Sequence, residues 1–273
     1  MNRTLKLSLQ IILTLGLIYF LWTRGDWSFY PFEFPDGFWF IVPLILLLTA
    51  LNWWLESEKW RQSNWNIVPI NRRRSLSETL QAHSIAIVSP LKLGEYPVKL
   101  SFYAKSQRTI LAKNIFYNNL FQAYATVLFG SLAALFFYRT LFPVDPLWVL
   151  IALPVSIFLL HKLWKLPQFW KLSLGLSLGR YLIFSSAMAL LIHVFQPETS
   201  LFEIYLGIAL SYFILTVLPV LSIFDWIAKT AAFVYIFSFI GVPKEVISIC
   251  VGLMWVLNWA LPAVLGALLF YRK

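Results

Sequence analysis

Residues 180–217 read RYLIFSSAMALLIHVFQPETSLFEIYLGIALSYFILTV, which is two long apolar runs joined by the short polar segment QPETS. Each run is close to the roughly 20 residues that an α-helix needs to cross the hydrocarbon of a bilayer. Arg180 opens the first run, whereas the connection carries Glu198 and, just beyond it, Glu203. The stretch therefore predicts two transmembrane helices with an acidic connection.

The whole chain repeats this pattern. Its 273 residues are 60% hydrophobic and only 12% charged, with a mean hydropathy of +0.74, which is more apolar surface than a soluble fold can bury. The alternation typical of a membrane β-barrel is absent. We predict an all-α, polytopic transmembrane helical bundle in which residues 1–273 form a single integral membrane domain. About eight spans are expected, at 5–23, 38–55, 114–138, 147–161, 181–195, 202–224, 226–241 and 246–270.

The basic residues predict an orientation, because Lys and Arg near a span stay on the cytoplasmic side. With a cytoplasmic amino terminus, nineteen of the 22 Lys and Arg residues fall on inner segments and three on outer loops. Both termini are then cytoplasmic. The net charge of +10 faces anionic lipid headgroups and does not indicate a nucleic-acid partner. The outer loops hold Arg24, Arg139 and Lys244 beside Asp26, Glu33, Asp36, Asp145, Glu198, Glu203 and Glu245.

Two polar stretches are predicted to lie at the membrane surface. The first is 56–113, and within it HSIAIVSP, residues 83–90, is apolar but too short to cross. If this segment enters and returns on the same side, the basic residues after it stay cytoplasmic, so we predict a re-entrant segment near 83–90. The second stretch, 161–180, interleaves Lys and Trp, as in a short interfacial helix, and a plain connecting loop is the alternative.

Two acid and base pairs stand out in apolar surroundings. SPLKLGEYPVKL, residues 89–100, places Lys99 four residues after Glu95, and LPVLSIFDWIAKTAAF, residues 218–233, places Lys229 four residues after Asp225. Residues at this spacing share a helical face. The two segments could be halves of a pseudo-symmetric repeat that brings both pairs to a transport site at the midplane. Alternatively, both lysines extend to the cytoplasmic interface.

Other polar residues complete the candidate site. Asn114, Asn118, Asn119, Gln122 and Thr126 line up on one helical face, which predicts a stripe facing the bundle or a wet path. Arg180 suits a lipid phosphate, or else anchors the inner edge of its span. No catalytic, nucleotide-binding or metal-ligand motif is present in the sequence, so we predict no catalytic residue, cofactor or metal. The candidate substrate-binding residues are Glu95, Lys99, Gln122, Arg180, Asp225 and Lys229.

Several of these segments together resemble the membrane region of the lysylphosphatidylglycerol synthase and flippase family. They are PLKLGEYPVKL (90–100), NNLFQAYATVLFG (118–130), LPVLSIFDWIAKTAAFVYIFSFIGVP (218–243) and LPAVLGALLF (261–270). The family motif of a proline, a Gly-Glu pair and a basic residue is matched by Pro90, Gly94, Glu95 and Lys99. Its later Gly-Val-Pro is matched by residues 241–243, Lys229 takes the basic place, and Thr230 stands where the family has an acid.

The resemblance implies a multi-pass protein of the bacterial plasma membrane that moves a phospholipid or lipid-linked headgroup between leaflets. The aminoacyl-transfer domain of the full synthases has no counterpart in these 273 residues, so synthesis of lysyl-lipid is not expected. A lipid translocase with membrane phospholipid as its partner is the leading hypothesis. The alternatives are an intramembrane transferase with Glu95 or Asp225 as base, and a non-transporting membrane subunit that binds a membrane or cytoplasmic protein. Enzymatic activity is not the expected function.

Overall fold

A computed structural model gives the structure of the protein and describes residues 33–87, 89, 93–141, 166–217 and 225–271. These residues form helices and turns and contain no strand. The helices are α2 (Phe38–Ser63), α3 (Arg72–Ala86), α4 (Glu95–Ser101), α5 (Lys105–Leu141), α7 (Trp170–Phe195), α8 (Leu201–Val217), α9 (Asp225–Ser238), α10 (Lys244–Trp255), a π-helical turn (Val256–Ala260) and α11 (Leu261–Tyr271).

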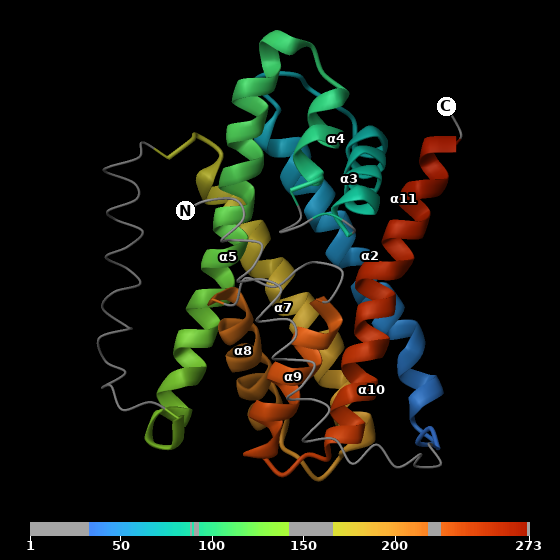
Figure 1. Cartoon of the computed structure of the whole chain (residues 1–273), viewed down its shortest axis with the longest axis vertical. Helices are drawn as coiled ribbons and strands as arrows, with labels where there is room; N and C mark the ends of the chain where they lie inside the picture. Colours follow the sequence, from blue (N-terminus) through green and yellow to red (C-terminus); the bar gives the residue numbers. More distant parts are fainter. Residues whose placement is uncertain (1–32, 88, 90–92, 142–165, 218–224, 272–273) are drawn as a thin grey trace.

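Four long helical segments run along the long axis of the molecule: α2, α5, α7 and the continuous rod of α10, the π-helical turn and α11 (Figure 1). Each of the four is long and apolar enough to cross a membrane. The protein is therefore a membrane protein with an all-helical described structure.

Two pairs of shorter helices fill the space between the long ones. In Figure 1, α3 and α4 enter from the end where α5 begins, and they turn back near the middle of the molecule. From the opposite end, α8 rises to the middle and α9 returns. The order of a long helix, two short helices and a long helix thus occurs twice, in α2–α5 and in α7–α11, and the second set runs in the opposite direction. Many transporters are built from such inverted repeats.

The two ends of the molecule carry opposite charge. Where α5 and α7 begin, the described residues Arg73, Lys105 and Lys171 are exposed. We call this the basic end. At the other end, the segment before α2, the connection between α7 and α8, and the first turns of α8 and α10 hold Glu33, Asp36, Glu198, Glu203 and Glu245, and the described cations there are Arg139 and Lys244. We call this the acidic end, and its composition is what the loop charges of the sequence predict.

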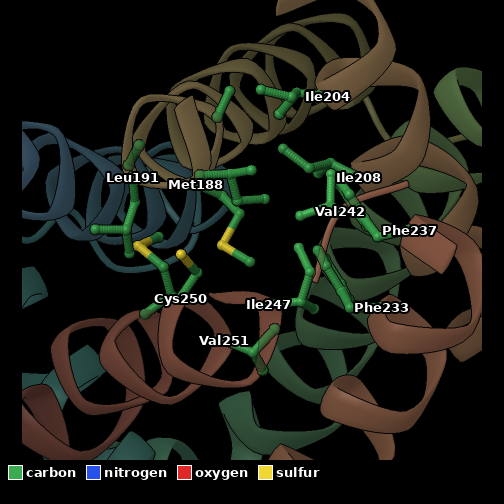
Figure 2. Packing of buried hydrophobic residues seen from close by; sticks show 14 of the residues in the cluster. Met188, Leu191, Ile204, Ile208, Phe233, Phe237, Val242, Ile247, Cys250 and Val251 are labelled. Atoms are coloured by element: carbon green, nitrogen blue, oxygen red, sulfur yellow. The ribbon is translucent and has the colours of Figure 1, made fainter. Parts of the chain in front are cut away.

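An apolar core packs the half of the molecule near the acidic end. Figure 2 shows Met188 of α7 pointing toward residues of α8, α9 and α10, with Phe233 and Phe237 closing one side. Ile208, Phe233 and Phe237 are fully buried. In a membrane, close packing rather than removal from water holds apolar helices together, and the contacts of this core hold the α8–α9 pair against α7 and α10.

Helix α11 crosses α3 with the two backbones in close contact. A Cβ atom at Gly266 would overlap the carbonyl group of Leu80, so only glycine fits there. The facing part of α3 carries the small buried residues Thr79 and Ala82. Small residues at a helix crossing allow this approach in membranes. The π-helical turn just before α11 has a local cause, since Pro262 has no N–H to donate to the carbonyl four residues earlier.

The structure extends several expected spans. Helix α2 continues to Ser63 where the sequence predicts an end at 55, and α7 begins at Trp170 where a separate interfacial segment is predicted. The reason is that Glu56, Lys59 and Ser173 are buried against other helices. The polar turns that contain them therefore pack inside the bundle and remain part of α2 and α7. The expected spans at 5–23 and 147–161 lie outside the described residues. So does part of the segment 83–90, whose first four residues form the last turn of α3.

Candidate functional site

A cavity of about 380 Å³ lies where the two short helix pairs approach one another. The ends of α3 and α8 and the starts of α4 and α9 all contribute to its wall, together with α2, α5, α7 and the π-helical turn. Its charged lining residues are Glu56, Glu95, Arg180, Asp225 and Lys229, and its amide and hydroxyl lining residues include Asn52, Asn119, Gln122, Thr126 and Asn258.

Five of the six residues expected from the sequence line this one cavity. They are Glu95, Gln122, Arg180, Asp225 and Lys229. The sixth, Lys99, is 3% exposed and lies behind Glu95, to which its Nζ donates a hydrogen bond. Both acid and base pairs therefore belong to one site, although 130 residues separate Glu95 from Asp225.

The two pairs have the same local construction. Glu95 is the first residue of α4 and Asp225 is the first residue of α9, where a carboxylate is stabilised by the positive end of the helix dipole. Each carboxylate binds the lysine one turn later. Each lysine also lies over a tryptophan ring, Lys99 at 4.8 Å from the Trp60 centroid and Lys229 at 4.4 Å from the Trp259 centroid. These cation–π contacts hold the ammonium groups in an apolar setting.

Gly94 allows α4 to begin at the cavity. Its N–H donates to the Ser89 hydroxyl at 2.8 Å, and a Cβ atom at this position would come within 3.0 Å of Ser89 and of the Ile85 carbonyl. The Gly-Glu sequence thus places the carboxylate of the second residue next to the end of α3.

Glu56 of α2 is the centre of a buried ion-pair network. Its Oε2 accepts hydrogen bonds from Arg180 Nη1 at 2.6 Å and from Lys59 Nζ at 2.9 Å. Arg180 also donates through Nε to Asn52 Oδ1 at 3.0 Å, and Asn52 Nδ2 donates to Asn258 Oδ1 at 3.0 Å. Through these contacts, one carboxylate connects α2 to α7 and, by way of Asn52, to the π-helical turn.

The polar stripe of α5 both faces the bundle and lines the cavity, the two alternatives that the sequence left open. Asn114 and Asn118 are buried and donate to the backbone and side chain of Ser63 at the end of α2. Asn118 also accepts from Ser173 of α7 at 2.7 Å. Farther along the same face, Gln122 lines the cavity and accepts from Arg180 Nη1 at 3.3 Å. Asn114 and Asn118 therefore hold α2, α5 and α7 together, and Gln122 forms part of the cavity wall.

A second buried carboxylate, Glu78 of α3, supports the basic half of the molecule. It accepts from Trp60 Nε1 at 2.9 Å, from the Tyr103 hydroxyl at 2.6 Å and from Arg74 Nε at 2.7 Å. Burial, followed by the Glu78 carboxylate, raises the pKa of the Tyr103 phenol well above its usual range. The phenol consequently stays protonated and keeps donating, which ties α2, α3 and the turn after α4 together.

Aromatic rings form much of the remaining wall. His83 lies between two tryptophans, with centroid distances of 4.6 Å to Trp53 and 5.2 Å to Trp259. Its Nε2 is 3.1 Å from the Trp259 carbonyl oxygen. On another side, Phe184 and Tyr212 meet edge to face. Within the described residues, His, Cys, Asp and Glu side chains form no group of three that could hold a metal ion.

The charges at and just behind the cavity wall do not balance. Three carboxylates, those of Glu56, Glu95 and Asp225, face four cations: Lys59, Lys99, Arg180 and Lys229. One positive charge is in excess. Such an arrangement favours an anionic group, or the phosphate of a zwitterionic one.

Several members of this site do not follow from the sequence-based prediction. The predicted span ends at residue 55, near Asn52 and before Glu56 and Lys59, and the predicted site does not include Asn258 or His83. A usable signal was present, because Asn52, Glu56, Lys59 and Ser63 follow one another at helical spacings of three and four residues. This spacing predicts one polar face that continues α2 past residue 55.

Comparisons with known proteins add no family to these observations: no family model, curated protein or solved structure matches the chain.

Proposed function

We propose that the protein is a lipid translocase that carries the headgroup of a phospholipid or lipid-linked molecule past the central cavity. The observation that carries this proposal is the joining of two helix-start ion pairs, from oppositely directed halves of the bundle, in one cavity with Arg180. An inverted repeat around a charged central site is the architecture with which transporters expose a site to each side in turn.

The arrangement of the ions indicates binding more than acid–base catalysis. Each carboxylate at the cavity has a cationic partner: Glu56 binds Arg180 and Lys59, Glu95 binds Lys99, and Asp225 binds Lys229. An incoming phosphate could take over hydrogen bonds from Arg180 while the displaced carboxylates bind the amine or hydroxyl groups of the headgroup. Bidentate geometry makes Arg well suited to this exchange. The acyl chains would remain in lipid.

In this proposal the basic end is cytoplasmic, with the α3–α4 pair re-entering from that side and both chain termini there. The positive-inside rule supports this orientation in a bacterial plasma membrane. The two lysine and carboxylate pairs then act at successive stages, Glu95 and Lys99 toward the cytoplasm and Asp225 and Lys229 toward the outer leaflet.

Translocation is tested by leaflet exchange of fluorescent phospholipid in vesicles that hold the purified protein. We expect the wild-type protein to accelerate exchange over empty vesicles. Glu95→Gln and Asp225→Asn should each slow it by about tenfold, since each removes a charge that replaces water around the headgroup.

Glu245→Gln is the matched control, because it makes the same change on an exposed residue of the acidic end and should exchange lipid at the wild-type rate. Size-exclusion profiles establish that each variant is folded. Wild-type rates equal to those of empty vesicles, or folded Glu95→Gln protein at full rate, would count against the proposal.

A further inference from the structure

A separate groove lies on the outside of the bundle near the basic end, between the end of α4 and the start of α5. It has a volume of about 710 Å³ and is lined by Leu100, Arg108, Thr109, Ala112, Lys113, Phe116 and Tyr117. None of these residues lines the central cavity. The groove therefore needs its own explanation.

The groove follows one face of α5. Six of its residues come in the adjacent pairs 108–109, 112–113 and 116–117, one pair per helical turn. Thr109 and Ala112 are small and so leave space along this face of α5, while Leu100 of α4 provides a facing wall. The result is an open groove whose lining residues follow a helix that is itself a candidate membrane span.

The side chains that line this groove change from basic to aromatic along α5. Arg108 and Lys113 stand in the first three turns of α5, and Phe116 and Tyr117 follow in the next turn, toward the middle of the span. No acidic residue lines the groove. Arg108 Nε donates to the Tyr103 carbonyl oxygen at 3.1 Å, which holds the guanidinium over the groove. Neither cation forms an ion pair within the described part of the chain.

We infer that this groove binds an anionic phospholipid, with its phosphate at Arg108 and Lys113 and an acyl chain along Phe116, Tyr117 and Leu100. Cations near a membrane surface attract anionic headgroups, and aromatic and aliphatic side chains one turn deeper suit the chain that follows the headgroup. An acidic protein segment would match the cations but not the apolar continuation toward the span centre. The site is distinct from the translocation cavity and goes beyond the proposed function.

The test is native mass spectrometry of purified full-length protein with phosphatidylglycerol or phosphatidylcholine of identical acyl chains. We expect the wild-type protein to retain phosphatidylglycerol preferentially. The double variant Arg108→Gln/Lys113→Gln should lose this preference, with about tenfold weaker retention of phosphatidylglycerol. The double variant Arg73→Gln/Lys171→Gln removes the same charge from exposed residues elsewhere at the basic end and should retain the lipid as wild type does.

Two further measurements distinguish binding of the whole lipid from binding of its phosphate group alone. Glycerol 3-phosphate at the same concentration should leave the lipid bound, and Phe116→Ala should weaken its retention. Equal losses in both double variants, no loss in either, or displacement by glycerol 3-phosphate would overturn the inference. Because the readout is binding, it stands whether or not the protein moves lipid across the membrane.

Discussion

Glu56→Gln is expected to lower the free energy of unfolding by about 3–5 kcal/mol. This is the typical cost of removing one partner of a buried ion pair, because the other charge stays buried without compensation. The carboxylate binds both Arg180 and Lys59, and the Lys59 side chain is only 2% exposed. Without Glu56, two cations face each other across the cavity wall with no counter-charge of their own. Thermal unfolding in detergent, followed by circular dichroism, measures the loss.

The double variant Glu56→Gln/Arg180→Gln removes one charge of each sign and should recover part of the lost stability. In a double-mutant cycle, the coupling between the two positions is expected to exceed about 1 kcal/mol, because the groups share a 2.6 Å hydrogen bond. Glu245→Gln is the control, since its pair with Lys244 is 4.0 Å long and exposed, and surface pairs contribute about 0–1 kcal/mol. Additive effects of the two single substitutions would show that the network is not a unit.

Gly266→Ala is expected to destabilise the fold by about 2–3 kcal/mol, in the upper range for overpacking, because the clash is with backbone. The added Cβ would overlap the Leu80 carbonyl, and a backbone group cannot rotate away as a side chain can. Helix α11 would have to move off α3, which weakens the support of the α3–α4 pair. Melting temperature and the yield of monodisperse protein in detergent measure the effect.

Gly252→Ala provides the matched control in the same helical rod. A Cβ atom there meets nothing within 4 Å, so stability should stay at the wild-type value or rise slightly from better helix propensity. If the two alanine variants melt at the same temperature, the close crossing of α11 and α3 does not stabilise the fold.

The sequence alone predicted the helical class, the four long apolar helices and five of the residues that line the cavity, but it also expected 202–224 and 226–241 to cross, where the structure has the shorter helices α8 and α9. The acid and base pairs could be found because Glu95 and Asp225 interrupt apolar segments and each has a lysine four residues later. Arg180 and Gln122 were recognisable for a similar reason, as polar groups at the start or within an apolar helix. Local spacing was sufficient for these residues.

Residue spacing along the sequence could not predict the tertiary partner of each polar group. Glu56 and Lys59 read as surface residues because hydropathy falls at the end of α2, yet Arg180, 124 residues away, holds the carboxylate inside the bundle. Likewise, Gly266 reads as an ordinary helical glycine until α3 is placed against it. Such tertiary contacts override the polarity signal from which span ends are inferred.

The half of the bundle near the acidic end is packed with apolar side chains, whereas the half near the basic end is held by buried charged groups. We therefore expect the packing of the two halves to respond to different solution conditions. Parting α8 and α9 from α10 would expose aromatic and aliphatic side chains such as Phe233 and Ile247. Where water reaches this apolar surface, the heat capacity of the protein increases. Parting α3 from α2 would instead uncover Glu78 and its donors, whose attraction dissolved salt weakens. In the proposed translocation cycle, we therefore expect the parting of α8 and α9 from α10 to depend mainly on temperature and the parting of α3 from α2 to depend mainly on ionic strength.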